Sequence, residues 1–225
     1  MSESVSSSRR DFLRWASAGT LAAAAAPSVL TGRTAYAAKP ISPNDKIRIG
    51  LIGSGIIGFE DTQTALKVPG VEIVAVADCY DGRLQRAKEV FGDHLFTTKV
   101  YQEILDRKDI DAVILAVPDH WHQQMAIEAL KAKKAVYLEK PMVQNIEEGA
   151  GLIAAEKETG GLLQVGSQVV SSTVTEKARK LYQQGVIGKL NMVNILISRN
   201  DYAVAKQVAS TIDASEKTID WDTFV

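Results

Sequence analysis

Cysteine and histidine are scarce in this chain of 225 residues. Cys79 is the only cysteine, so no disulfide can form within the chain. Of the three histidines, His120 and His122 are two residues apart, a spacing that does not stack on one face of a helix. No cluster of cysteine or glutamate accompanies them. We therefore expect no metal site.

The chain also lacks an excess of charge of either sign. It has 26 Lys and Arg against 27 Asp and Glu, a formal net charge of -1, so it offers no basic face for nucleic acid. Beyond the N-terminal stretch, no apolar run is long enough to span a bilayer. Hydrophobic residues make up 46% and charged residues 24%, an ordinary globular balance. The length favours one large domain, or one domain and part of another.

The first 37 residues have the pattern of an export signal. Arg9-Arg10-Asp11-Phe12-Leu13 resembles the twin-arginine consensus, and a weakly apolar, alanine-rich stretch follows it. Ala35-Tyr36-Ala37 has the small-x-small pattern of a cleavage site. An amphipathic N-terminal helix or a secretory signal for unfolded export are the alternatives. We expect residues 1–37 to direct export to the periplasm, with no stable membrane span after their removal, and residues 38–45 to form a linker. The twin-arginine route carries folded proteins, so it suits an enzyme that acquires a nucleotide before export.

Strands and helices alternate over residues 46–168. Apolar strands are expected at Ile47–Ile52, Val71–Ala77, Ala112–Val117, Ala135–Leu138 and Leu162–Val165. Helices are expected from the glycine-rich segment to Val68 and at Arg83–Phe91, Tyr101–Leu105, Asp119–Ala132 and Ile146–Glu158. The alternation predicts an α/β fold with a doubly wound parallel sheet of the Rossmann type and right-handed crossovers.

Residues 169–225 follow a different pattern. A helix is expected over Thr175–Gln184 and one long strand over Lys189–Arg199, whereas Asp201–Val225 is polar and irregular. One strand cannot build a sheet, so either it pairs with another chain or the sequence is a fragment. We favour the fragment, and expect residues 169–225 to be the incomplete start of a second α/β domain with an open sheet.

The segment Gly53-Ser54-Gly55-Ile56-Ile57-Gly58 leaves the first strand and opens a helix. Such a motif is weak alone, but this context is typical of a dinucleotide-binding loop. Gly53 permits the tight turn, Gly55 lets the backbone approach the pyrophosphate, and Gly58 lets the helix pack close to the strand. The helix N-terminus adds unpaired N–H groups and a partial positive charge. A glycine-rich turn without a ligand is the alternative.

Asp78 ends the second strand, twenty residues beyond Gly58. A carboxylate in this position accepts both ribose hydroxyls of NAD and repels a 2′-phosphate. Arg83 is close enough in sequence to soften that preference. We therefore expect NAD as the cofactor, with NADP possible.

Two further loops follow strands of the predicted sheet. Ligands of such sheets bind at the carboxyl ends of the strands, so Val117, Pro118 and His122 are placed to face the cofactor. Glu139 and Lys140 end the next strand. A buried lysine beside a glutamate can donate to a substrate hydroxyl, or can transfer a proton if its pKa falls. A surface ion pair of little energetic value is the alternative.

Together these residues resemble the glucose–fructose oxidoreductase, inositol dehydrogenase and rhizopine-catabolism (Gfo/Idh/MocA) family. The resemblance rests on the glycine loop, Asp78, Pro118-Asp119-x-x-His122, Glu139-Lys140-Pro141 and Gly166-Ser167-Gln168, in that order. It implies that Lys140 contacts the substrate hydroxyl and the nicotinamide ribose. It also implies that Glu139 and His122 line the nicotinamide side of the site.

The resemblance also implies an activity: NAD(P)-dependent hydride transfer on a sugar, cyclitol or related polyhydroxy substrate, by a protein that self-associates at full length. In the family, a later Asp-x-x-x-His segment provides the histidine that acts as general acid/base, and this sequence ends before any such segment. Two alternatives stay open. One is an NAD-dependent glycosidase that acts through transient oxidation, and the other is a truncated dinucleotide-binding module without activity.

Overall fold

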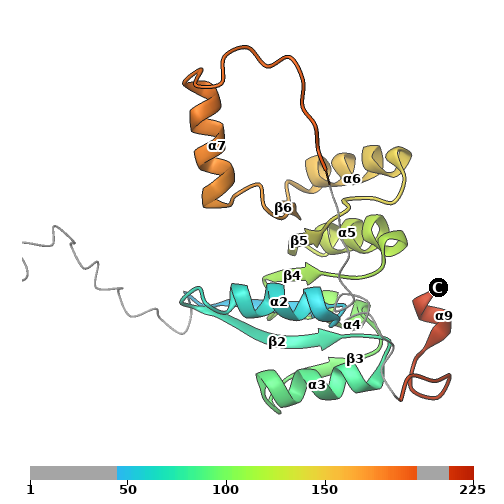
Figure 1. Ribbon diagram of the computed structural model, residues 1–225. Coiled ribbons are helices and arrows are strands. Elements are labelled where there is room, and N and C mark those ends of the chain that lie inside the picture. Colours follow the sequence, from blue (N-terminus) through green and yellow to red (C-terminus); the bar gives the residue numbers. More distant parts are fainter. Residues whose placement is uncertain (1–44, 197–212) are drawn as a thin grey trace, which may run out of the picture. The chain divides into compact units, whose positions relative to one another are not determined.

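The computed structural model of the protein describes residues 45–196 and 213–225. Within them, one six-stranded sheet has the order β3-β2-β1-β4-β5-β6, and every neighbouring pair is parallel (Figure 1). The predicted export signal, residues 1–37, and nearly all of the predicted linker, residues 38–45, lie outside the described residues. No helix of the described part is both long and apolar enough to cross a bilayer.

The six strands are short and lie close to their predicted positions. They are β1 (Ile47–Ile52), β2 (Val71–Ala77), β3 (Phe96–Thr98), β4 (Ala112–Leu115), β5 (Ala135–Glu139) and β6 (Leu163–Gly166). The five predicted strands are confirmed, with ends that shift by at most two residues. The sequence did not predict β3, because three residues without a buried apolar side chain carry no strand pattern.

Helices follow the strands in alternation. They are α2 (Ile56–Ala65), α3 (Asp81–Phe91), α4 (Gln102–Leu105), α5 (His122–Lys131), α6 (Ile146–Thr159), α7 (Thr173–Gln183) and α9 (Trp221–Phe224), with a 3-10 turn η2 (Asp119–Trp121) before α5. The predicted helix from Asp119 is therefore wrong at its start: Asp119 opens the 3-10 turn without a side-chain cap, and α5 begins at His122.

Two apolar cores sandwich the sheet. Leu51 and Ile114 point to one face, where they belong to a cluster that includes Phe59 of α2. Their neighbours Ile52 and Leu115 point to the opposite face and its cluster, because successive residues of a strand alternate sides. A strand buried on both faces is apolar throughout, which is why these strands could be read from the sequence.

The predicted strand over Lys189–Arg199 is wrong for the residues that the structure describes. Residues 189–196 form no strand, and Leu196 is 93% exposed. Residues 197–199 lie outside the described part. Apolar residues in an extended segment form a strand only when a neighbouring strand supplies hydrogen-bond partners, and within the described residues none does. The second domain with an open sheet therefore stays a prediction.

Candidate dinucleotide and substrate site

The glycine loop joins β1 to α2 at the carboxyl edge of the sheet. Gly53 has a φ of 89°, and its N–H donates to the carbonyl of Ala77 at 2.9 Å, which anchors the turn at the end of β2. A Cβ at Gly53 would lie 2.3 Å from the carbonyl oxygen of Ala116. One at Gly58 would lie 2.1 Å from the carbonyl oxygen of Gly53. Neither position can accept a side chain without moving the backbone.

Gly55 has space for a side chain, whereas Gly53 and Gly58 do not. A Cβ there would meet only the guanidinium of Arg83, at 3.7 Å, within the 4 Å contact range. Helix α2 begins after Gly55 without a side-chain cap, and Ile56 and Ile57 are exposed in its first turn. Uncapped N–H groups beside a guanidinium attract an anion. These residues therefore fit the pyrophosphate of a dinucleotide.

Asp78 lies at the end of β2, and its carboxylate faces the glycine loop. One oxygen accepts hydrogen bonds from the N–H of Ser54 at 2.8 Å and its hydroxyl at 3.1 Å, and the other from the N–H of Tyr80 at 3.0 Å. The side chain of Asp78 is 2% exposed, whereas that of Arg83, 3.6 Å away, is 45% exposed. Asp78 thus ties the loop to the β2–α3 link, and Arg83 is the accessible charge beside it. A ribose contact of Asp78 stays a prediction.

His122 connects the loops that follow β4 and β5. Its ring is 1% exposed, with Nε2 3.0 Å from the carbonyl oxygen of Val117 and Nδ1 against the carbonyl oxygen of Pro141. Because both ring nitrogens face backbone carbonyls, neither is directed at a substrate in this arrangement. The geometry gives His122 a role in positioning Val117, Pro118 and Pro141.

Glu139 is buried, and its carboxylate is held by two neighbours. Both oxygens accept from the side-chain amide of Gln168 at 2.8 Å, and one accepts from the N–H of Lys140 at 3.2 Å. The side chain of Lys140 is exposed, and within the described residues no ion pair joins it to Glu139. Neither the buried lysine nor the surface ion pair considered from the sequence is therefore formed. The Gly166-Ser167-Gln168 motif supplied the only sequence indication of Gln168.

Two groups that the sequence did not indicate, Asp61 and Tyr137, lie near Glu139. Burial, together with Glu139 and Glu60, raises the pKa of Asp61 to about 6, and its Oδ2 is buried without a hydrogen-bond partner among the described residues. Burial, with the carboxylates of Asp61 and Glu139, also raises the pKa of Tyr137. Gly166 provides the space that Glu139 and Tyr137 occupy, because a Cβ there would lie 2.5 Å from Oε1 of Glu139 and 2.6 Å from the hydroxyl of Tyr137.

Comparison with known proteins identifies the family. Residues 47–167 match the model described as the oxidoreductase family with an NAD-binding Rossmann fold. The chain belongs to the Gfo/Idh/MocA oxidoreductase family. A glycosyl hydrolase family 109 protein of Shewanella baltica is 29% identical over 205 residues, which cover 81% of this chain and 44% of that protein. The scyllo-inositol 2-dehydrogenase (NAD(+)) of Bacillus subtilis is 30% identical over 145 residues, 64% of this chain and 42% of that enzyme. The chain thus spans less than half the length of these relatives.

Solved structures agree with this assignment. The myo-inositol 2-dehydrogenase of Lactobacillus plantarum matches with a TM-score of 0.60 and 27% identity, over 64% of this chain and 43% of that chain. A 3-ketoreductase of Actinomadura kijaniata in complex with NADP and TDP-benzene has a TM-score of 0.59 and 28% identity, over 64% and 44%. A dehydrogenase of Bordetella pertussis in complex with NADH and UDP-GlcNAcA has a TM-score of 0.59 and 29% identity, over 64% of this chain and 43% of that chain. The predicted Gfo/Idh/MocA family, fold and NAD(P) cofactor are confirmed.

Replacing Gly58 with alanine should disrupt the loop. The new Cβ would lie 2.1 Å from a backbone oxygen, so the turn must open, and we expect a lower melting temperature and at least about a tenfold loss of NAD affinity by calorimetry. Gly149→Ala is the matched control, because a Cβ at this buried glycine of α6 would meet Met142 at 3.7 Å, an ordinary contact. Equal behaviour of the two variants would contradict the steric requirement at Gly58.

Replacing Asp61 with asparagine should stabilise the protein at neutral pH. A carboxyl whose pKa is raised to about 6 on folding contributes stability at low pH that is lost as the pH rises through that value. An uncharged side chain avoids this loss. The gain in unfolding free energy should therefore grow between about pH 4 and pH 7, to about 1 kcal/mol once solvent screening is allowed for. Urea unfolding at both pH values measures it, with Glu158→Gln, at an exposed acid of α6, as control. A gain that does not change with pH would contradict the role of Asp61.

Proposed function

We propose that the whole protein is an exported NAD(P)-dependent oxidoreductase of sugars, cyclitols or related polyhydroxy compounds. The observation that carries this proposal is the placement of Lys140. Its exposed amine follows β5, at the same carboxyl edge of the sheet as the glycine loop, while its neighbour Glu139 is fixed by Gln168. Relatives named for inositol and structures with nucleotide-linked ligands support a polyhydroxy substrate.

The residues of the site would have two roles: some would bind the cofactor, and Lys140 would exchange a proton with the substrate hydroxyl. Bound NAD(P) would accept or donate the hydride. The first turn of α2 and Arg83 would hold its pyrophosphate and ribose, and His122 keeps the loops around Val117 and Pro141 in place. The amine of Lys140 would donate a hydrogen bond to the reacting hydroxyl, or accept its proton when uncharged.

NAD is the cofactor we favour, with NADP tolerated. Asp78 gives the ribose end of the site a negative charge, but its carboxylate is already occupied by Ser54 and Tyr80. Arg83 is exposed beside it and can pair with a 2′-phosphate. A preference for NAD without strict exclusion of NADP follows from this pair.

A second reaction is favoured by one specific observation. Several relatives are named glycosyl hydrolase family 109 proteins, and the chain matches one of them over 205 residues. Oxidation of the sugar, elimination and re-reduction would hydrolyse a glycoside and leave NAD unchanged. Release of the aglycone from an aryl glycoside without net formation of NADH would support this reaction. Accumulation of NADH when a free polyol is given as the substrate would support dehydrogenation.

A native mass spectrum of the whole protein purified from the exported fraction tests the main proposal. We expect a polypeptide cleaved after Ala37, self-associated, that retains a dinucleotide whose mass distinguishes NAD from NADP. Tight retention is expected because an exported enzyme has no free nicotinamide pool to draw on. An uncleaved protein confined to the cytoplasmic fraction would contradict export, and a protein that neither retains nor binds a dinucleotide would contradict the oxidoreductase.

Replacing Lys140 with methionine should lower kcat for the physiological substrate class by about 100-fold or more, because the hydroxyl loses its proton partner. NAD affinity should change little, since the glycine loop and Arg83 remain. Steady-state kinetics on a panel of cyclitols and sugars, together with NAD titration, separates the two effects. Lys131→Met, at an exposed lysine that ends α5, is the matched control. An unchanged kcat would contradict the proposed role of Lys140.

A further inference from the structure

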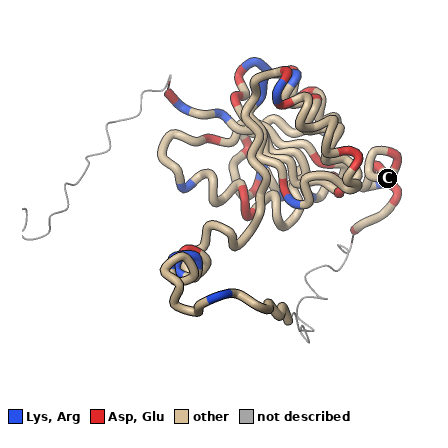
Figure 2. The backbone as a smooth tube through the Cα atoms, turned by 90° about the horizontal axis from the view of Figure 1, so that it is seen from above, with Lys and Arg blue, Asp and Glu red and all other residues tan. Residues whose placement is uncertain are grey.

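The described strands carry few charged residues, and one of these, Glu139, has no cationic partner within the described part of the chain. Charges gather on the helices and loops around the sheet (Figure 2), and the six strands contain only Arg48, Glu72 and Glu139. Arg48 and Glu72 form an ion pair with each other at 3.0 Å, near the starts of β1 and β2. Glu139 ends β5, and its carboxylate is held by uncharged donors, the amide of Gln168 and the N–H of Lys140.

Asp61 of helix α2 is the second carboxyl group of this region. Gly58 and Thr62 are buried where α2 meets the sheet, and Asp61, three residues after the first and one before the second, lies on the same side of the helix. A Cβ at Gly58 would contact the Cβ of Ala116, directly beyond β4, at 3.3 Å. The carboxyl group of Asp61 thereby lies over the carboxyl half of the sheet, where the charge of Glu139 acts on it.

Tyr137 and Gly166 complete this cluster. Tyr137 and Glu139 are two residues apart on β5, so both point to the face of the sheet that α2 covers. A Cβ at Gly166, which is opposite Glu139 on β6, would lie within 2.6 Å of the hydroxyl of Tyr137 and of Oε1 of Glu139. The hydroxyl and the two carboxyl groups therefore gather at one end of the sheet.

The surroundings of Asp61 provide no compensation for a negative charge. Its Oδ2 is buried and has no hydrogen-bond partner among the described residues. The titratable groups that face it are Glu60 on α2 and Tyr137 and Glu139 on β5, whereas the carboxyl ends of β1 and β4 present no charged side chain. Burial, together with Glu139 and Glu60, raises the pKa of Asp61 to about 6. Around that pH, a second negative charge appears beside Glu139.

The fold assigns the two halves of a dinucleotide to the two halves of the sheet. The order β3-β2-β1-β4-β5-β6 reverses between β1 and β4, and each half of such a sheet takes one mononucleotide. Asp78 and Arg83, at the ribose end of the proposed site, follow β2. The nicotinamide half therefore falls at the carboxyl ends of β4 and β5, where Glu139 lies. The nicotinamide ring is positively charged in oxidised NAD and neutral in NADH.

We propose that Asp61 is a specificity-determining residue, which makes the preference of the site for oxidised NAD over NADH depend on pH; this inference rests on the proposed function. When Asp61 is protonated, Glu139 provides the negative charge near the ring. When Asp61 is ionised, two carboxylates stabilise the positive ring of oxidised NAD, and the neutral ring of NADH gains nothing from the second one. The preference for oxidised NAD therefore increases as the pH rises, and binding of oxidised NAD in place of NADH favours release of the proton from Asp61.

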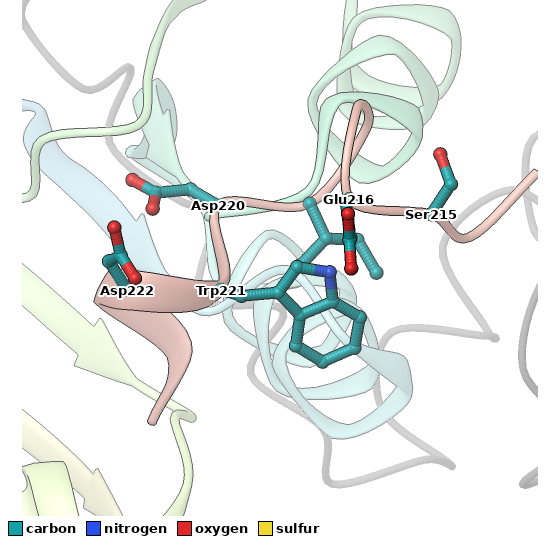
Figure 3. A pocket seen from close by; sticks show the side chains of 6 residues that line it. Ser215, Glu216, Asp220, Trp221 and Asp222 are labelled. Atoms are coloured by element: carbon teal, nitrogen blue, oxygen red, sulfur yellow. The ribbon is translucent and has the colours of Figure 1, made fainter.

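A second group of acids lies at the other half of the sheet. Figure 3 shows the carboxylates of Glu216, Asp220 and Asp222 on one short segment near Val225. This segment is fixed to the link after β2, because the N–H of Asp220 donates to the carbonyl of Cys79 at 2.9 Å. Hydrogen bonds from a neighbouring threonine, through its hydroxyl and its N–H, lower the pKa of Asp220, which therefore stays ionised near pH 6. Asp222 is exposed and provides a matched control acid.

Dissociation constants of oxidised NAD and NADH, measured on the whole protein at about pH 5 and about pH 7.5, test the inference. We expect the ratio of the NADH constant to the NAD constant to rise at least about threefold between the two pH values in wild type. Asp61→Asn, which resembles the neutral acid, should show at both pH values the ratio that wild type shows at the lower one. Asp222→Asn, which removes an acid from the other half of the sheet, should show the same rise as wild type.

The asparagine variant also separates Asp61 from the histidines of this edge, because His120 and His122 are unchanged in it. A ratio that does not change with pH in wild type, or a rise that persists in Asp61→Asn, would overturn the inference and leave the proposed function intact. A ratio in Asp61→Asn that differs from that of wild type at the lower pH would also overturn it, by showing a structural effect. A wild-type protein that binds neither dinucleotide would overturn the proposed function itself.

Discussion

The carboxylate of Asp78 organises the coenzyme end of this site. Its donors are the backbone and hydroxyl of Ser54 in the glycine loop and the backbone of Tyr80 beyond β2. A buried charge is tolerated only when such donors surround it, and removal of the partners of a buried charge costs about 3–5 kcal/mol. The shape of the loop, the position of Arg83 and the bridge from Tyr80 to Ile219 therefore all depend on this one group.

The regular core of the fold could be predicted because its physics is local. Strands covered on both faces are continuously apolar, and glycine, proline and charged residues mark their ends. Prediction failed where a neighbour decides the structure. The three residues of β3 form a strand only because Ala75–Ala77 lies beside them, and residues 189–196 form none because the described chain places no strand next to them. Residues 213–225 look irregular in sequence, yet hydrogen bonds to Cys79 and Asp81 order them.

For the site, the sequence indicated which residues take part but not how their side chains are oriented. Motif spacing indicated the glycine loop, His122, Glu139 and Lys140, because backbone geometry and residue type together limit what a strand end can do. It could not indicate that both nitrogens of His122 face carbonyls, or that Glu139 binds Gln168 while Lys140 remains exposed. Those outcomes depend on which side chains compete for the same acceptors in the folded chain. Asp61 had no sequence pattern at all, since only the fold brings its helix near Glu139.

Helix α2 links the two ends of the site. Its first turn offers uncapped N–H groups at the glycine loop, and its second turn carries Asp61 near Glu139. Burial and the charge of Glu139 raise the pKa of Asp61 to about 6, so near neutral pH a second negative charge develops beside the carboxylate that holds the backbone of Lys140. Helix α2 therefore contributes to both ends of the site, through its first turn at the glycine loop and through Asp61 near Glu139.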